Sequence, residues 1–295
     1  MTKPKISVII ELKLIREEDE MRERKTNERD AVISIVKSGI LNVGTDKIDI
    51  AESLEVNSSI IYRDKQISSI STTGKINKEQ CKTYILSCGS GDIPFDERFK
   101  HKKVCILNFA SSKNPGGGFM TGANAQEENL CYHSNLYDCL AKHMSFYEFN
   151  RNNLNKGLYT EGIIFTKDVL FFKKNFKNVA PKFADVITCA APNKGAALRN
   201  GVKSIDIDKV MSARLEKILK VAIDNDVETL VLGAFGCGVF KNDIDYVANE
   251  IRKLLYVKGY ARYFKNIVIP VLKPNGKEYS SFVNAFRGVS NLTVE

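Results

Sequence analysis

The sequence predicts an α/β fold built on a mixed, mostly parallel sheet, and two observations support this prediction. From Cys81 onward, short apolar runs of strand length alternate with longer stretches at helical spacing. Two of the helical stretches open on Asp or Asn, which cap free backbone N–H groups at helix starts. Residues 1–80 lack this alternation. We therefore expect residues 1–80 to form an accessory helical and extended segment that packs on a core domain at residues 81–295.

The accessory segment carries one clear helix signal. Residues 17–38 are charged at first and then apolar at helical spacing, and Gly39 is a suitable stop. The apolar stripe comprises Ala31, Val32, Ile35 and Val36. This helix can either pack on the core or contact a partner. Residues 40–80 are polar and weakly periodic, which indicates short strands and loops.

The core domain contains six predicted strands and three predicted helices. The strands lie at 83–87, 104–109, 163–166, 185–190, 228–233 and 266–271, and the helices at 125–143, 206–225 and 243–258. Asp206 and Asp208 are the candidate caps of the second helix, and Asn242 or Asp243 caps the third.

Composition and charge narrow the class of protein. Of the 295 residues, 43% are hydrophobic and 27% are charged, which argues against disorder as the main state. No apolar run approaches the ~18 residues that span a bilayer, and the N-terminus lacks the apolar core of a signal peptide, so we expect a cytoplasmic or nuclear chain. The net charge of +9 suits a polyanionic partner, although solvated lysine-rich faces would explain it equally well.

The seven cysteines are scattered without a CxxC, which argues against a disulfide framework or a zinc site.

The first glycine-rich segment follows the predicted strand at 104–109. Pro115 precedes three glycines, Gly116, Gly117 and Gly118, which leave the backbone free of Cβ atoms and able to adopt positive φ. Such a loop, beyond the carboxyl end of a strand, can present several N–H groups to a phosphate or a sugar. A flexible hinge is the alternative explanation.

Gln126, Glu127 and Glu128 open the helix that follows these glycines. Neighbouring residues on a helix lie about 100° apart, so the two carboxylates cannot face one point equally. In a glycosidic site we therefore expect one glutamate to move the proton and the other to bind a hydroxyl group. Compensation of the helix dipole by two first-turn carboxylates is the alternative.

The second glycine-rich segment runs from Gly233 to Phe240, between a predicted strand and a predicted helix, an arrangement that binds anions. It is not a dinucleotide-binding fingerprint, because G-x-G-x-x-G fails at Lys241, and it lacks the Gly-Lys-Ser/Thr of a P-loop. Cys237 could be a nucleophile, but no histidine is nearby in the sequence, and a small side chain beside a phosphate explains it more simply. Phe240 could contact a ligand or belong to the core.

These segments resemble a known family. The three glycines, seven further residues and Gln-Glu-Glu resemble the signature of poly(ADP-ribose) glycohydrolases. The stretch LNFASSKNPGGGFMTGANAQEENLCYHSNLY is similar to the microbial-type branch of that family. The resemblance continues through DVITCAAPN at 185–193 and VLGAFGCGVFKND at 231–243, and it covers roughly residues 80–290.

The resemblance implies a three-layer macrodomain fold and hydrolysis of the ribose–ribose O-glycosidic bonds of poly(ADP-ribose), with ADP-ribose as the product. It implies that Glu128 is the catalytic carboxyl, first as general acid and then as general base, and that Glu127 holds a ribose hydroxyl. The implied substrate-binding residues are Asn108, Asn114, Gly116, Gly117, Gly118, Gln126, Gly236, Cys237, Gly238, Val239 and Phe240. The second glycine-rich loop would wrap the diphosphate. No cofactor and no metal are implied, and we expect a monomer whose partners are poly(ADP-ribose) or ADP-ribosylated macromolecules.

Three alternatives remain at this point. The chain could be a non-catalytic ADP-ribose-binding macrodomain, although binding alone does not require the Gln-Glu-Glu motif. It could remove single ADP-ribose units from protein or DNA, or it could be a metal-dependent nucleotide-phosphate hydrolase. The resemblance does not identify the aromatic side chain that stacks on adenine, and Phe282 and Phe286 are candidates by residue type only.

Overall fold

The computed structural model describes residues 4–72, 76–100 and 103–295. Its strands are β1 (Ile40–Val43), β2 (Asp46–Asp49), β3 (Ser58–Tyr62), β4 (Lys82–Leu86), β5 (Val104–Phe109), β6 (Ile163–Lys174), β7 (Lys177–Cys189), β8 (Thr229–Val231), β9 (Asn266–Pro270) and β10 (Leu292–Val294). All six predicted strands are present, with β6 and β7 longer than predicted because they continue into one long hairpin. The sequence analysis did not resolve β3 as a separate strand, and it missed β10.

The larger sheet has eight strands in the order β10-β4-β9-β8-β5-β7-β6-β3. Every neighbouring pair from β10 to β7 is parallel, whereas β6 pairs antiparallel with both β7 and β3. The prediction of a mixed, mostly parallel sheet is therefore confirmed. Because β8, β5 and β7 are parallel neighbours, the loops that follow them leave the same edge of the sheet.

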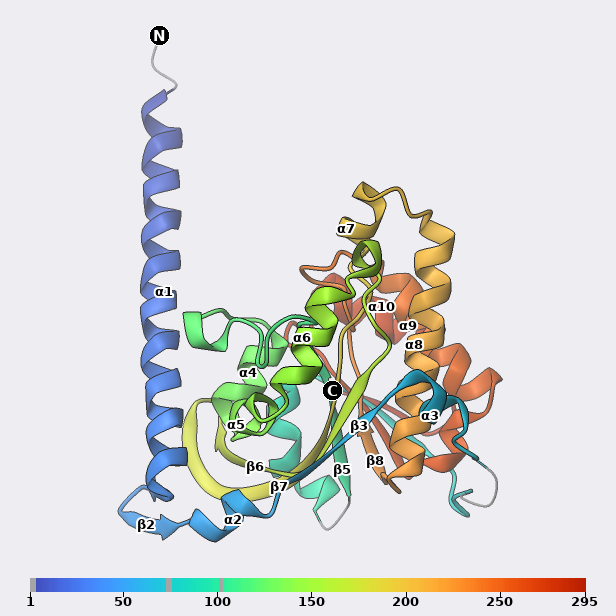
Figure 1. Cartoon of the computed structure of the whole chain (residues 1–295), viewed down its shortest axis with the longest axis horizontal. Coiled ribbons are helices and arrows are strands. Elements are labelled where there is room, and N and C mark those ends of the chain that lie inside the picture. Colours follow the sequence, from blue (N-terminus) through green and yellow to red (C-terminus); the bar gives the residue numbers. More distant parts are fainter. Residues whose placement is uncertain (1–3, 73–75, 101–102) are drawn as a thin grey trace.

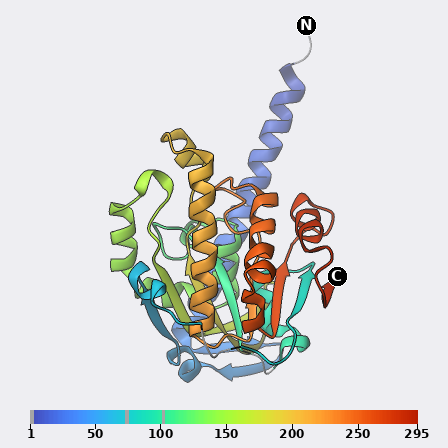
Figure 2. The same ribbon diagram turned by 90° about the vertical axis from the view of Figure 1, so that its right-hand side faces the viewer.

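The helices are α1 (Pro4–Ser38), α2 (Ala51–Glu55), α3 (Asp64–Ser68), α4 (Gln126–His133), α5 (Leu136–Ala141), α6 (Met144–Asn152), α7 (Lys194–Arg199), α8 (Ser204–Asp224), α9 (Ile244–Arg252) and α10 (Lys277–Phe286). Alternation along β5 shows how the sheet separates two cores. Cys105 and Leu107 face a core that includes side chains of α8, α9 and α10, and Val104 and Ile106 face a second core beneath α1 and α4–α6. The result is three layers, with the sheet in the middle (Figure 1; Figure 2 faces the α8–α9 side).

Local signals explain where the helices differ from the prediction. The predicted helix at 125–143 is interrupted at Ser134, whose backbone is extended and whose hydroxyl donates to Leu130 O and accepts from Leu136 N. The helix predicted at 243–258 continues past α9 as a π-helix, Lys253–Val257. Asp243 caps α9 by accepting from Tyr246 N, as predicted. The cap prediction for α8 is wrong, because this helix begins before Asp206 and has no side-chain cap.

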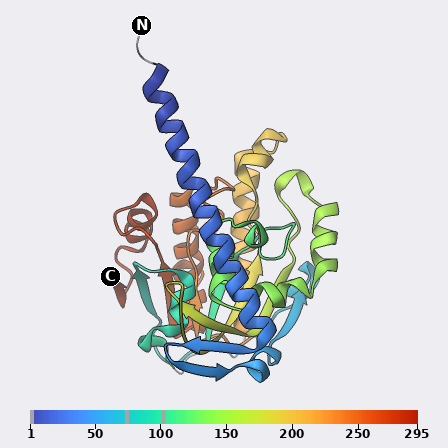
Figure 3. The same ribbon diagram turned by 90° about the vertical axis from the view of Figure 1, so that its left-hand side faces the viewer.

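The N-terminal segment is built around α1, a helix of 35 residues. The predicted helix at 17–38 is present and extends back to Pro4. Its C-terminal half packs on the body, where Val32 joins the second core, and its N-terminal half projects beyond the rest of the molecule (Figure 3). The segment also supplies β3, which forms one edge of the larger sheet. No described helix is both long and apolar enough to cross a membrane.

Candidate active site

Three loops meet at the carboxyl ends of β5, β7 and β8. The first glycine-rich segment follows β5, residues 190–193 follow β7, and the second glycine-rich segment follows β8. Close contacts join them: the Ala110 N–H donates to Cys189 O at 3.1 Å, and a Cβ at Gly236 would lie 2.5 Å from the Cβ of Ala191. The structure thus brings the two motifs, more than a hundred residues apart in the sequence, to one edge of the sheet.

Gly117 packs directly against both acidic side chains. Its φ is +60°, and a Cβ at this position would lie 2.3 Å from Glu128 Oε1 and 2.8 Å from Glu127 Oε2. Both the backbone conformation and the lack of space therefore require glycine here. Gly116, with φ of +66°, is similarly crowded, because a Cβ there would lie 2.8 Å from the Tyr137 ring.

Backbone N–H groups fix the carboxylate of Glu128, which is only 7% exposed. Oε1 accepts from Gly118 N at 2.7 Å, and Oε2 accepts from Ala125 N at 2.9 Å. No salt bridge in the described ranges includes Glu128. The acid is thus held against the glycine loop by neutral donors, and each of its oxygens keeps a second lone pair for a ligand.

Glu127 is more deeply buried and has different partners. Its Oε2 accepts from Ser111 N at 2.7 Å, and its Oε1 accepts from Asn108 Nδ2 at 3.3 Å. Burial raises the pKa of Glu127 to about 8, the Ser111 N–H opposes this shift, and the negative charge of Glu128 adds to it. Near neutral pH, Glu127 therefore carries a proton.

The amide of Gln126 is occupied by β5. Its Oε1 accepts from Phe109 N at 2.8 Å, and its Nε2 donates to Leu107 O at 2.9 Å. This pair of hydrogen bonds joins the start of α4 to the end of the strand. Gln126 therefore positions the two glutamates that follow it, and its amide does not face the glycine loop as a free group.

The two predicted asparagines lie in different surroundings. Asn108 is fully buried at the end of β5, where its Nδ2 donates to Glu127 and Thr188, and its Oδ1 has no partner among the described residues. Asn114 is exposed, and its backbone carbonyl accepts from Gly117 N at 3.1 Å. Asn108 thus orients Glu127, and the backbone of Asn114 shapes the glycine turn.

The second glycine-rich loop is tight at its base and open at its tip. Gly236 has a φ of +72°, and Asn242 Nδ2 donates both to Gly236 O and to Pro192 O at 2.8 Å. A Cβ at Gly238, in contrast, would meet no atom of the described chain within 4 Å apart from its sequence neighbours, and Val239 is 81% exposed. The tip is therefore accessible to a ligand, and the base is anchored to the loop after β7.

Comparison with known proteins identifies this arrangement. Residues 23–174 match the family model described as microbial-type PARG, catalytic domain. The chain belongs to the microbial-type poly(ADP-ribose) glycohydrolase family. The family predicted from the glycine and glutamate motifs is therefore confirmed, and so are the fold class and the enzyme class, a glycosidase that hydrolyses poly(ADP-ribose).

Solved structures agree with this assignment. The poly(ADP-ribose) glycohydrolase of Thermomonospora curvata, bound to the inhibitor ADP-HPD, matches with a TM-score of 0.80 and 27% identity over 90% of this chain and 100% of that one. The Deinococcus radiodurans enzyme in complex with ADP-ribose matches with a TM-score of 0.71 and 30% identity over 79% of this chain and 95% of that one. Among curated proteins, none matches this chain.

Four side chains considered in the sequence of this glycohydrolase can now be interpreted. Burial raises the pKa of Cys237 to about 12, so its sulfur is a protonated thiol and not an activated nucleophile. Phe240 is half-buried, with its ring 5.7 Å from the ring of Tyr159. The adenine-stacking role considered for Phe282 and Phe286 is wrong, because both rings are fully buried in the core beneath α10.

One charged residue near the site of the glycohydrolase was not among the predicted site residues. Arg214 of α8 is 1% exposed, and its Nη1 donates to Leu158 O at 3.0 Å and to Ala190 O at 2.8 Å. Its Nε and Nη2 have no hydrogen-bond partner within the described ranges. The available signal was an arginine among the apolar positions of that helix, such as Met211 and Leu215.

Proposed function

We propose that this chain hydrolyses the ribose–ribose O-glycosidic bond of poly(ADP-ribose) through Glu128, and that it releases ADP-ribose as a monomeric enzyme. The observation that supports this most strongly is the buried carboxyl pair held against the glycine loop by backbone N–H groups. The solved relatives bound to ADP-ribose and ADP-HPD support the choice of ligand.

In the first step, the proton of Glu128 passes to the ribose oxygen that leaves as the glycosidic C–O bond breaks, and positive charge develops on the other ribose as an oxocarbenium-like species. In the second step, the Glu128 carboxylate takes a proton from water while the water oxygen bonds to the anomeric carbon. Glu128 regains its proton, so the cycle needs no other reactant. The fixed Gly118 and Ala125 N–H groups keep the carboxylate in one orientation through both steps.

Glu127 complements Glu128 because burial keeps its carboxyl neutral. With a pKa of about 8, Glu127 is neutral at pH 7. It therefore adds no second negative charge beside the carboxylate that Glu128 becomes when it gives up its proton. A neutral carboxyl also donates a hydrogen bond, which suits the oxygen of a ribose hydroxyl. We therefore assign Glu127 to substrate binding and Glu128 to proton transfer.

The second glycine-rich loop is the proposed cradle of the diphosphate. Its tip at Gly238 and Val239 is open, so the backbone there is accessible to a ligand. The buried guanidinium of Arg214 lies beneath the adjacent loop at Ala190 and adds a fixed positive charge. These features favour an anionic ligand that extends from the first glycine-rich loop toward Gly238.

The decisive experiment is Glu128→Gln, which removes the transferable proton and keeps the shape. We expect release of ADP-ribose from the polymer to fall by at least about 100-fold, because general acid–base catalysis contributes about 10²–10⁴. ADP-ribose binding, measured by calorimetry, should change little. Glu148→Gln, an exposed glutamate of α6, is the matched control. Hydrolysis by Glu128→Gln at the wild-type rate would show that the role is wrongly assigned.

The substrate class requires a separate assay. Wild-type enzyme should release ADP-ribose from poly(ADP-ribose) and leave a single protein-linked ADP-ribose unit in place. Release from mono-modified protein or DNA at a comparable rate would instead indicate a mono-ADP-ribosyl hydrolase. Binding without any release would indicate a non-catalytic macrodomain.

A further inference from the structure

Helix α1 contacts the end of the first glycine-rich loop through two arginines. Arg22 Nε donates to Thr121 O at 3.0 Å, and Arg29 Nη1 donates to Met120 O. Both carbonyls belong to the short 3₁₀ turn Phe119–Thr121, which begins directly after Gly118. The N–H of Gly118 is the group that holds Oε1 of Glu128. The carbonyls that accept from the arginines, at Met120 and Thr121, therefore lie two and three residues after Gly118, whose N–H donates to Glu128.

A glycine permits this close contact. Gly122 ends the turn with a φ of +77°, and a Cβ there would lie 2.9 Å from Arg22 O and 3.0 Å from Thr26 Oγ1. Arg22, Thr26 and Arg29 are spaced four and three residues apart, so they share one face of α1. The turn and the helix are thus complementary in backbone shape as well as in hydrogen bonding.

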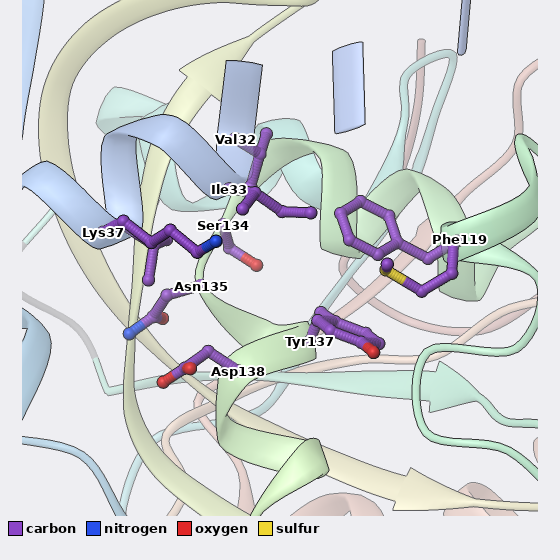
Figure 4. Close-up of a pocket in the computed structure, with 10 residues that line it drawn as sticks. Val32, Ile33, Lys37, Phe119, Ser134, Asn135, Tyr137 and Asp138 are labelled. Atoms are coloured by element: carbon purple, nitrogen blue, oxygen red, sulfur yellow. The ribbon is translucent and has the colours of Figure 1, made fainter. Parts of the chain in front are cut away.

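One side of the turn faces a pocket that is open to solvent. A cavity of about 270 Å³ lies between α1 and the start of α5, with Val32 and Ile33 on one side and Phe119 and Tyr137 on the other (Figure 4). Met120 also lines it and is 45% exposed. Phe119, the first residue of the turn, is fully buried against the rings of Tyr132 and Tyr137. Packing therefore holds that end of the turn, and the hydrogen bonds to α1 hold Met120 and Thr121.

Helix α1 is itself fixed to the body by other contacts. The Lys25 ammonium lies 3.8 Å from the centre of the Phe176 ring, at the end of the β6–β7 hairpin. Glu28 forms an ion pair with the nearly buried Lys173 at 2.8 Å. The helix therefore does not need the turn for its own anchoring, and it can serve as a fixed support for the turn.

We propose that Arg22 and Arg29 are positioning residues of the active site, which hold the turn at 119–121 so that the Gly118 N–H stays on Glu128. This inference rests on the proposed role of Glu128. The hydrogen bonds of the two arginines to the loop go to main-chain carbonyls and not to Glu127 or Glu128. Their charged N–H groups make stronger hydrogen bonds to the two carbonyls than a neutral donor would. The N-terminal helix is thereby part of the catalytic apparatus.

The test compares Arg22→Ala/Arg29→Ala with Arg24→Ala, an exposed arginine on the same helix. We expect kcat on poly(ADP-ribose) to fall about tenfold or more, because small misplacements of a catalytic group cost this much. The Kd for ADP-ribose should stay within about twofold, since the second glycine-rich loop is not attached to α1. Arg22→Lys/Arg29→Lys should recover most of the rate, because an ammonium can still donate to the carbonyls.

Several outcomes would overturn the proposal. A kcat equal to that of Arg24→Ala would show that the contacts are incidental. Equal losses in kcat, ADP-ribose affinity and melting temperature, without recovery in the lysine variant, would show a purely structural role. The milder single variants Arg22→Gln and Arg29→Gln allow the same comparison if the double alanine variant fails to fold. If Glu128→Gln is active, the proposed function fails; if Glu128→Gln is inactive and the arginine variants are normal, only this inference fails.

Discussion

The two glycine-rich loops use the same residue type for opposite purposes. At Gly117, glycine is required because two carboxylate oxygens occupy the space of a side chain. At Gly238, the space is empty and the neighbouring Val239 is 81% exposed. The first loop is therefore already filled by the carboxyls of Glu127 and Glu128, and the second leaves its backbone open. The comparison indicates that the first loop organises chemistry and the second binds the ligand.

The strongest way to break this comparison is Gly117→Ala. A methyl group there would displace the carboxylates of Glu127 and Glu128, so we expect polymer hydrolysis to fall by at least about 100-fold. ADP-ribose release measures the rate, and calorimetry measures the affinity for ADP-ribose. Gly238→Ala is the comparison variant in the loop proposed to bind the ligand, and we expect it to weaken ADP-ribose affinity more than it slows turnover at saturating polymer. Equal losses in the two variants would contradict the distinction between the loops.

Gly236→Ala tests the anchored base of the second loop. A Cβ there would meet the Ala191 Cβ at 2.5 Å and Asn242 Nδ2 at 2.7 Å, and φ of +72° adds strain. We expect a free energy of unfolding lower by about 1–3 kcal/mol and an ADP-ribose affinity about tenfold weaker. Chemical denaturation and calorimetry check these values. An unchanged affinity would mean that the base of the loop does not shape the binding site.

A pH titration of stability tests the raised pKa of Glu127 beside the first loop. Because the folded state raises the Glu127 pKa from 4.5 to about 8, it binds this proton more tightly than the unfolded state does. The free energy of unfolding should therefore decrease as pH rises from about 4.5 to about 8, by up to about 1.4 kcal/mol per pH unit from this group. Glu127→Gln should flatten the decrease, whereas Glu148→Gln should not. Identical slopes in wild type and Glu127→Gln would refute the shift.

The smallest effect is expected from Cys237→Ser. With a pKa of about 12, the thiol is protonated at neutral pH and supplies no nucleophile. Hydrolysis should therefore stay within about threefold of wild type, and thiol-alkylating reagents should modify Cys237 slowly. Loss of activity in the serine variant would show that the second loop takes part in chemistry after all.

The sequence predicted those parts of the molecule whose signal is local. The apolar run at 104–109 coincides with β5, and the rule that ligands bind beyond the carboxyl ends of parallel strands correctly placed the first glycine segment at such an end. The Gln126–Glu128 motif identified the start of α4, because its residues act within a few positions of one another. The assignment of separate roles to Glu127 and Glu128 stays a prediction.

What the sequence could not show depends on contacts between distant segments. Arg29 and Met120 are 91 residues apart, so a charged helix surface looked like a solvated face. Phe282 and Phe286 could have been either ligand contacts or core residues, because residue type does not reveal which helix face is buried. The break at Ser134 arises from hydroxyl hydrogen bonds that a helical pattern conceals. The boundary at residue 80 stays a prediction, and β3 crosses it by pairing with β6.

The place of β3 has a practical consequence for anyone who shortens this chain. A fragment beginning at Cys81 would lack the strand that covers Ile163–Lys167 of β6. The uncovered backbone would then present a row of free donors and acceptors, a template on which strands of other molecules can add. The N-terminal residues thus shield the sheet from aggregation, a duty independent of any reaction.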